Sequence, residues 1–466
     1  MPITFQQVGQ ISGITAFSSQ SPQSEFVAVV FNPTMPALLF QYNSTYPAIV
    51  IGSQTQEFLW SQYSSQQFYS ATITAYEVPT LWFANAVLTG GLIANNGICA
   101  SVEYYWYAVY NQQNNSFNYS CNVAPANKNL SWLLDIAVDY VNQNVYLLHT
   151  ATITLGAVIF AIPFNQLSTL INNLTFPSEW YVAALLPQGL PQAGGYILGN
   201  MVYYNETFYI AIIISQLGQP YQLYEWVISY SDITWNNSYP SAGSSVGTLY
   251  QVYNPGNTNN EIQFGISFLV YVNQQGNINP EIMLYFQYGG TLYIYQFDPN
   301  QLTPTNLFQL SNANASPFAI NFGGNVTFIQ SPSKGVYTVS MFNPSSLAYE
   351  QSNQITNVLG VGLAHGGYLV TLSGSQSSLT ITIYQILVDT AIVIQNLQYS
   401  NGVLSGTVIN LNGNTPLSGV TVYLYQLQTE GDNYITGQQV TTTTTDPNGN
   451  FSFQITQVGY YGILVF

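Results

Sequence analysis

Short apolar runs alternate with polar turns along nearly the whole chain. The runs are rich in Val, Ile, Tyr, Phe and Thr, and clusters of Asn, Gly, Pro or Gln separate them. Branched and aromatic residues favour strands, and these turn residues end them. No long segment keeps a helical period with capping residues. We therefore expect an all-β protein.

One pattern recurs along the chain, in which a strand runs into an anchor residue, a polar turn and an apolar residue. It occurs in IFAIPFNQL, EWVISYSDI, LYIYQFDPNQL, TVSMFNPSSL and, more weakly, TITIYQIL. Their anchors are Phe164, Tyr230, Phe297, Phe342 and Ile386, with Tyr42 and Tyr110 extending the series toward the N-terminus. Intervals of about 45 residues suit four-stranded propeller blades, and longer intervals suit blades with an extended loop. The series predicts a β-propeller-like body of about seven blades over residues 1–389. A string of immunoglobulin-like sandwiches built from the same strands is the alternative.

The segment 390–466 has a different pattern. It contains Ser405-Gly406-Thr407-Val408, then Pro416-Leu417-Ser418-Gly419-Val420 entering a strand, and Thr445-Asp446-Pro447-Asn448-Gly449 before Phe451 and Phe453. These motifs resemble the carboxypeptidase-regulatory-like or transthyretin-like sandwich family, which is close to Cna-B-type domains. The resemblance implies a small C-terminal β-sandwich of accessory or adhesive type. Some Cna-B-type domains carry a Lys-Asn isopeptide bond. No lysine follows Lys334, so that bond cannot form in this segment.

The most apolar window, 145–164, is long enough to test as a membrane span. It contains His149, three threonines and a Leu-Gly pause at its centre, so we interpret it as two buried strands joined by a tight turn. The N-terminal MPITFQQVGQISG lacks the basic and apolar regions of a secretory signal. Either the chain is already processed, or it reaches the exterior without a signal, as a virion protein does.

Charge is nearly absent, since 4% of the 466 residues are charged, compared with roughly a quarter in an ordinary domain. Two lysines and no arginine leave no electrostatic basis for binding nucleic acid. Asn, Gln, Ser, Thr and 38 Tyr supply polarity instead. Neutral polarity suits an acidic exterior, where carboxylates are protonated and salt bridges cannot form.

Cys99 and Cys121 are the two cysteines, and an even number in an apparently extracellular protein favours a disulfide, with two buried thiols as the alternative. Potential N-glycosylation sequons fall mostly in polar turns. They begin at Asn43, Asn114, Asn118, Asn129, Asn173, Asn205, Asn236, Asn314, Asn325 and Asn450. With this composition, chance alone gives roughly as many sequons, so their placement is more informative than their number.

Catalytic chemistry has little support in the sequence. Asp135 and Asp139 should share one face of a strand, whereas a glycosidase needs two carboxylates facing each other across a sugar. The G-x-S-x-G run at 243–247 lies in a loop, and His149 and His365 are the only imidazoles. Asp446, Asn448 and Asn450 have the alternate spacing of calcium ligands, although DPNG is also an ordinary hairpin turn. We expect no cofactor and no metal.

Aromatic and amide side chains are the remaining candidates for a binding surface. Trp106, Trp180 and Trp235 are candidates for stacking on sugar rings, and Asn and Gln offer hydrogen bonds that do not depend on pH. The alternative for each is a place in the core. In composition and architecture the whole chain resembles spike, tail-fibre or turret proteins of viruses that infect thermoacidophilic archaea. We expect a non-catalytic virion surface protein that attaches to host-envelope glycans, with the sandwich joining it to the particle or to sister subunits. A secreted surface-layer or filament protein and an extracellular glycan hydrolase are the alternatives.

Overall fold

The computed structural model is built from β-strands joined by turns, and no α-helix occurs among the residues it describes. These residues are 3–14, 24–30, 37–42, 46–51, 54–57, 67–78, 81–91, 100–111, 116–125, 130–139, 142–151, 156–166, 179–190, 194–216, 222–237, 244–253, 263–272, 278–288, 291–297, 304–311, 319–320, 326–333, 336–343, 348–364, 368–375, 378–388, 392–410, 414–430, 433–457 and 460–465.

The first three blades are antiparallel sheets whose strands follow one another along the chain. Blade 1 holds β2 (Ser24–Val30), β3 (Ala37–Tyr42), β4 (Tyr46–Ile51) and β5 (Gln54–Glu57). Blade 2 holds β6 (Gln67–Val78), β7 (Leu81–Gly91), β8 (Ala100–Asn111) and β9 (Ser116–Pro125). Blade 3 holds β10 (Leu130–Asp139), β11 (Asn144–Ala151), β12 (Ala157–Pro163) and β13 (Tyr181–Pro187), with the short helix η2 (Phe164–Gln166) after β12.

Blades 4 to 6 continue the series with the same connectivity. Blade 4 holds β14 (Gly194–Tyr204), β15 (Thr207–Gln216), β16 (Gln222–Ser229) and β18 (Thr248–Tyr253), with η3 (Tyr230–Asp232) after β16. Blade 5 holds β19 (Gln263–Val272), β20 (Ile278–Tyr288), β21 (Thr291–Phe297) and β22 (Pro304–Ser311). Blade 6 holds β23 (Ala319–Ile320), β24 (Val326–Ser333), β25 (Val336–Asn343) and β26 (Ala348–Gln351).

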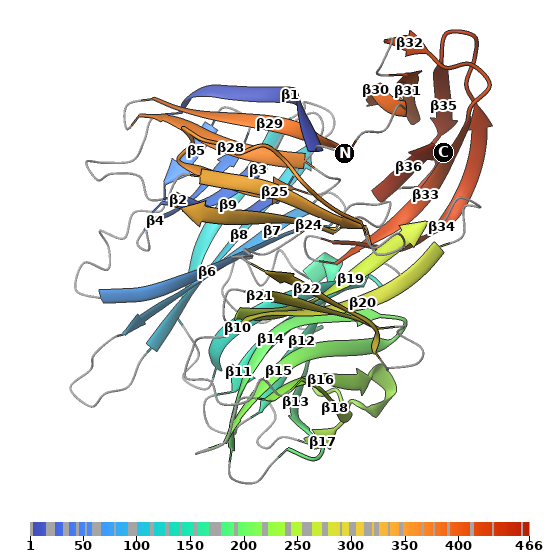
Figure 1. Cartoon of the computed structure of the whole chain (residues 1–466). Helices are drawn as coiled ribbons and strands as arrows, with labels where there is room; N and C mark the ends of the chain where they lie inside the picture. Colours follow the sequence, from blue (N-terminus) through green and yellow to red (C-terminus); the bar gives the residue numbers. More distant parts are fainter. Residues whose placement is uncertain are drawn as a thin grey trace.

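Blade 7 is completed by the first strand of the chain. β27 (Gly360–Ala364), β28 (Tyr368–Ser375) and β29 (Ser378–Val388) are followed in the sheet by β1 (Ile3–Ile14), which pairs antiparallel with β29 from Ile3 opposite Val388 to Ile14 opposite Leu379. The inner strands of blades 1 to 6 contact one another in order, β27 of blade 7 contacts β24 of blade 6, and β2 meets β27 through the pair Val29–Ala364. Figure 1 shows the blades as separate sheets packed side by side. The propeller of seven blades is therefore confirmed, and ring closure rules out the string of sandwiches.

The recurring anchors mark one structural position. Tyr110, Phe164, Tyr230, Phe297, Phe342 and Ile386 lie at or just beyond the end of the third strand of blades 2 to 7. Tyr42 instead ends the second strand of blade 1. The apolar window 145–164 forms the paired strands β11 and β12, as predicted. No helix in the described part of the chain is long and apolar enough to cross a membrane.

The last seven strands form two further sheets. One contains β30 (Ile392–Ser400), β31 (Val403–Asn410), β32 (Thr415–Pro416) and β35 (Asn450–Gln454), and the other contains β33 (Thr421–Glu430), β34 (Asn433–Thr444) and β36 (Tyr460–Val465). Their shared core includes Val408, Val422, Leu424, Phe451 and Phe453. This is the predicted C-terminal sandwich. Strands β33 and β34 also lie beside β10, β19 and β23, which are inner strands of three different blades; Figure 1 shows β34 next to β19.

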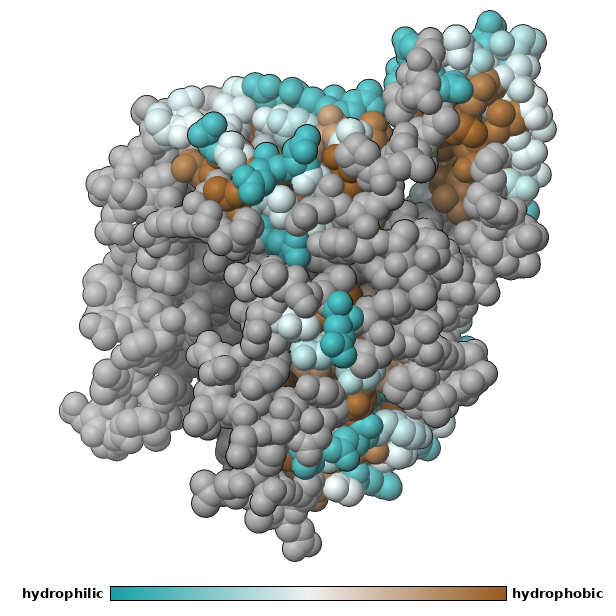
Figure 2. All heavy atoms as spheres, in the orientation of Figure 1, coloured by the Kyte–Doolittle hydropathy of each residue, from teal (hydrophilic) through white to brown (hydrophobic). Residues whose placement is uncertain are grey.

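Neutral polar groups cover exposed strands. On β1, the Gln7 amide donates to Gln10 Oε1 at 3.1 Å, and the Gln10 amide donates to Ser12 Oγ at 2.8 Å. Figure 2 shows hydrophilic residues along this upper edge of the molecule. Amide and hydroxyl groups here occupy places that charged side chains take on most proteins.

A candidate binding site between blades 3 and 4

Asp135 and Asp139, for which the sequence offers little support as a catalytic pair, both accept structural hydrogen bonds. They lie on one face of β10, as expected, with Asp135 7% and Asp139 2% exposed. Asp135 Oδ2 accepts the backbone N–H of Met201 in blade 4 at 2.7 Å. Asp139 accepts the backbone and side-chain N–H groups of Asn142 at 3.0 and 2.8 Å, which closes the β10–β11 turn. The carboxylates thus hold a blade joint and a turn together.

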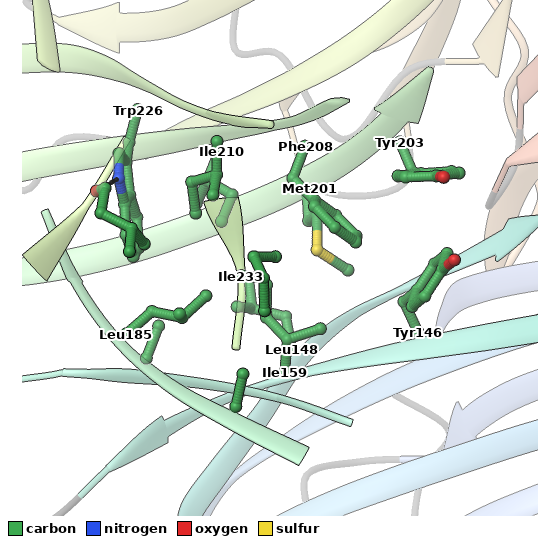
Figure 3. Close-up of a cluster of buried hydrophobic side chains, with 14 of the residues drawn as sticks. Tyr146, Leu148, Ile159, Leu185, Met201, Tyr203, Phe208, Ile210, Trp226 and Ile233 are labelled. Atoms are coloured by element: carbon green, nitrogen blue, oxygen red, sulfur yellow. Dashed lines mark hydrogen bonds between the residues drawn. The ribbon is translucent and has the colours of Figure 1, made fainter. Parts of the chain in front are cut away.

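A buried aromatic cluster fills the space beside Asp139. The ring centroid of Tyr146 lies 4.7 Å from that of Tyr203 and 4.9 Å from that of Phe208, which meets it edge-on. The Tyr146 hydroxyl donates to Asp139 Oδ2 at 3.3 Å. Figure 3 shows Tyr146 and Tyr203 at one end of the joint and Trp226 with Leu185 at the other. The rings of Tyr146, Tyr203 and Phe208 form a buried base, called the floor below, in which rings from both blades hold one another in place.

An aromatic patch, made of Tyr181, Tyr230 and Trp235, lies at the edge of this floor. Trp235 is half-buried, and its ring centroid lies 5.3 Å from that of Tyr230 and 6.2 Å from that of Tyr146. Tyr181 is 46% exposed. Its chain neighbour Val182 forms an antiparallel bridge with Asn236, which places Tyr181 diagonally beside Trp235 on one face. The patch is thus a partly exposed aromatic surface supported from below.

Backbone hydrogen bonds fix both chain segments of the patch. The N–H of Tyr230 donates to the Glu206 carbonyl at 2.8 Å, where Glu206 has a positive φ of 56° in the β14–β15 turn. Val182 and Asn236 exchange N–H to carbonyl bonds of 2.7 and 3.1 Å. After η3 the chain thus leaves blade 4 and adds to the outer strand of blade 3. It continues as β17 (Ser244–Val246), parallel to β13, before returning as β18.

The hydroxyl groups of Tyr146, Tyr203 and Tyr230 stay protonated from acid to neutral pH. Burial raises the pKa of Tyr230, and the nearby Asp139 and Tyr181 raise it further. Burial is also the main cause that raises the pKa values of Tyr146 and Tyr203. The exposed Glu206 and Asp232 are acidic groups at the border of the patch.

The predicted tryptophans do not form one surface. Trp180 packs on Phe160 at a centroid distance of 5.9 Å, on the opposite face of blade 3 from Trp235. Trp106 lies on β8 opposite Cys121 of β9, and its side chain is outside the described set. Of the two tryptophans whose side chains are described, Trp235 belongs to the patch and Trp180 does not. Tyr181, which composition alone does not distinguish from the other tyrosines, was missed.

Few of the modification sites fall where the structure describes side chains. Cys99 lies outside the described residues, and for Cys121 the backbone alone is described, so the disulfide stays a prediction. Asn205 and Asn236 are exposed, and Asn236, which pairs with Val182, lies on the face opposite to Tyr181 and Trp235. Asn450 is exposed, but its side chain accepts from Thr407 Oγ1 and donates to Asp446. Asn118 lies on β9, and the remaining sequons, at Asn43, Asn114, Asn129, Asn173, Asn314 and Asn325, lie outside the described residues.

The other candidate motifs have structural roles where they are described. Ser244–Val246 is a short strand and not the loop we expected, and Val246 accepts the indole N–H of Trp226 at 3.1 Å. Asp446 accepts the backbone N–H groups of Asn448 and Asn450, both at 2.8 Å, which is the ordinary hairpin turn. His149 is buried edge-on against Phe160, and His365 is outside the described residues. No cluster of three or more potential metal ligands occurs in the described part of the chain.

Comparisons with known proteins find no sequence relative, and the solved structures they find have low sequence identity. The chain matches no model of a protein family and no curated protein by sequence. A polysaccharide lyase, a PL25 ulvan lyase bound to its sugar, is 10% identical over 82% of this chain and 96% of its own, with a TM-score of 0.45. The Dos1 propeller is 8% identical over 82% and 95%, with a TM-score of 0.41. The WD40 domain of SCAP from fission yeast is 9% identical over 77% and 82%, with a TM-score of 0.38.

Proposed function

We propose that this protein is a non-catalytic attachment protein of an acidic exterior, and that the aromatic patch binds host-envelope glycans or glycoproteins. The observation that carries the proposal is the exposed Tyr181 beside Trp235 and Tyr230, on a floor of buried rings. Sugars present C–H faces that pack on aromatic rings, and rings held rigid lose little conformational entropy on binding.

The surroundings of the patch favour a neutral ligand. The exposed Asn205 lies in the β14–β15 turn next to Glu206, whose carbonyl oxygen accepts the Tyr230 N–H, and amides pair with sugar hydroxyls at any pH. With two lysines and no arginine, the chain has few groups for pairing with an anionic ligand. Glycan binding of this kind suits a virion surface protein, in which the sandwich joins the propeller to the particle or to sister subunits.

The test is binding of host-envelope glycans at pH 3 to wild type, Tyr181→Ala and Tyr181→Phe. Loss of one aromatic contact should weaken binding roughly two- to tenfold in the alanine variant, while the phenylalanine variant keeps most of the affinity. Tyr399→Ala is the matched control, because Tyr399 is 56% exposed on the sandwich, away from the patch. Equal affinity of the Tyr181→Ala variant and wild type, or turnover of the oligosaccharide, would contradict the proposal.

A further inference from the structure

Glu225 is a carboxyl group buried at the joint between blades 4 and 5. It lies in the middle of β16 and is 0% exposed. Neither of its carboxylate oxygens has a hydrogen-bond partner among the described residues. Buried polar groups are nearly always paired, so an orphaned carboxyl calls for a physical account.

The alternation of β16 places Glu225 on the face toward blade 5. Its strand neighbours Leu223 and Val227 belong to the hydrophobic cluster that blades 4 and 5 share, whereas Trp226 and Ile228 face blade 3. Across the joint, the cluster is completed by apolar residues of β20, namely Ile282, Leu284 and Phe286. In register beside Glu225 are Ala211 of β15 and Tyr250 of β18.

The described titratable groups around this cluster are tyrosines. They are Tyr204 from β14, Tyr209 from β15, Tyr250 from β18, and Tyr293 and Tyr295 from β21. The side chains of β19 lie outside the described set, and Tyr271 is the one titratable residue of that strand. Burial is the single cause that shifts the pKa of Glu225, and it raises the value to about 8. The neutral, protonated carboxyl is thus the form that this joint accommodates.

We propose that Glu225 is a pH-sensitive lock on the joint between blades 4 and 5, closed while its carboxyl group is protonated. In acid the side chain is neutral and the two blades pack through an uncharged interface. Ionisation places an unpaired carboxylate among apolar side chains, which favours opening of the joint so that water can reach the charge. The lock does not depend on whether the aromatic patch binds glycans.

The direction of the pH effect follows from the two pKa values. The folded value of about 8 lies above the ordinary value of 4.5, so the folded protein binds the proton more tightly than the unfolded chain does. The stability that this provides is fully present below pH 4.5 and is lost as the pH rises to 8. For a carboxyl group with these values, the unfolding equilibrium constant rises on the order of a thousandfold over this window.

The experiment measures unfolding of wild type, Glu225→Gln and Glu225→Met from pH 3 to pH 9. Both variants should remove most of the loss of stability between pH 4.5 and 8, and Glu179→Gln, which alters an exposed carboxylate, should keep it. Hydrogen exchange, corrected for the intrinsic pH dependence, should show the amides of β16 and β20 opening earlier in wild type than in Glu225→Gln. Parallel pH profiles for wild type and both Glu225 variants would overturn the proposal.

Infrared spectroscopy of the wild-type protein tests the same claim without a substitution. A carboxylic acid C=O band should persist at pH 6, where ordinary carboxylates are ionised, and should disappear as the pH passes about 8. If the variants do not fold, this measurement still shows whether Glu225 is protonated in the folded wild-type protein. Absence of the band at pH 6 would show that Glu225 is ionised in the folded protein and would overturn the lock.

Discussion

Asp135 Oδ2 accepts the backbone N–H of Met201 across the joint between blades 3 and 4, at 2.7 Å. Met201 follows the irregularity in β14, where the register with β15 shifts between Leu198 and Met201. The carboxylate of one blade therefore satisfies a backbone group at the irregular point of the next blade. A buried N–H without a partner costs about 1–3 kcal/mol, which makes this contact a testable element of the ring.

Substitution of Asp135 tests the blade joint directly. Asp135→Ala removes the acceptor of the Met201 N–H and should lower the free energy of unfolding by about 1–3 kcal/mol. Asp135→Asn keeps a carbonyl oxygen at the same place and should lose less. Chemical denaturation of the two variants provides the measurement, and equal losses would show that the hydrogen bond to Met201 is not the source of the effect.

A matched pair of glycines tests the close approach beneath Trp226. Gly247 and Gly189 have similar positive φ values, 73° and 78°, so alanine is strained at both positions. A Cβ at Gly247 would lie 2.3 Å from the Val227 carbonyl oxygen, whereas a Cβ at Gly189 meets nothing within 4 Å. Gly189→Ala should cost about 1–2 kcal/mol, and Gly247→Ala should cost clearly more. Similar melting temperatures for the two variants would contradict the packing of this turn.

Acid should preserve the fold of the whole protein. Protonation breaks few ion pairs in a chain with two lysines and no arginine, and the neutral form of Glu225 suits its site. The opposing group is Asp446, whose pKa is lowered mainly by the backbone N–H of Asn450, so its contribution is lost as the pH falls. Because Asp446 is exposed, this loss should be small. Thermal unfolding at pH 3 should match or exceed that at pH 7, and a collapse at pH 3 would remove the acid-habitat argument.

The cysteine pair predicts a covalent link within blade 2. Peptide mapping without reduction should recover Cys99 and Cys121 as one linked pair, and thiol labelling of the unfolded chain should find none. A link across this interval stabilises by about 3 kcal/mol in the chain-entropy model. Reduction should therefore lower the melting temperature, and two labelled thiols would refute the link and weaken the extracellular assignment.

A fragment spanning 390–466 should fold alone with modest stability, since it has a hydrophobic core of its own. Its circular dichroism should show strands and a cooperative thermal transition. The contact of β33 and β34 with inner strands of the propeller should add stability in the whole chain. A fragment that stays unfolded even when mixed with the rest of the protein would contradict the domain boundary.

Strand content and blade repetition could be predicted because both depend on local pattern. The aromatic and aliphatic anchors recur where each third strand ends, so their spacing gave the number of blades. Tyr42 was assigned to the same series although it ends the second strand of blade 1. A strand followed by a polar turn has the same sequence pattern whether it is the second or the third strand of a blade.

The site depends on contacts that local pattern does not contain. Trp235 lies diagonally beside Tyr181 because the chain leaves blade 4 and pairs with blade 3 through Val182 and Asn236. Glu225 reads as an outward polar position in QLYEWVIS, yet stacked blades bury both faces of a sheet, so alternation within the strand does not reveal its environment. Trp180 and Trp235 face opposite sides of blade 3, and the sequence around each tryptophan does not reveal this either.

The pairing of β1 with β29 also constrains the order in which the molecule can fold. β1 is made before its partner β29, and the strands of six blades lie between them in the sequence. Contacts between residues so far apart in sequence form slowly, because a long loop must close before they contribute. Blades in the middle of the chain can form from neighbouring strands meanwhile. Closure by β1 is therefore expected to be the late step of folding, and the β1–β29 seam is the natural place for the ring to begin to open.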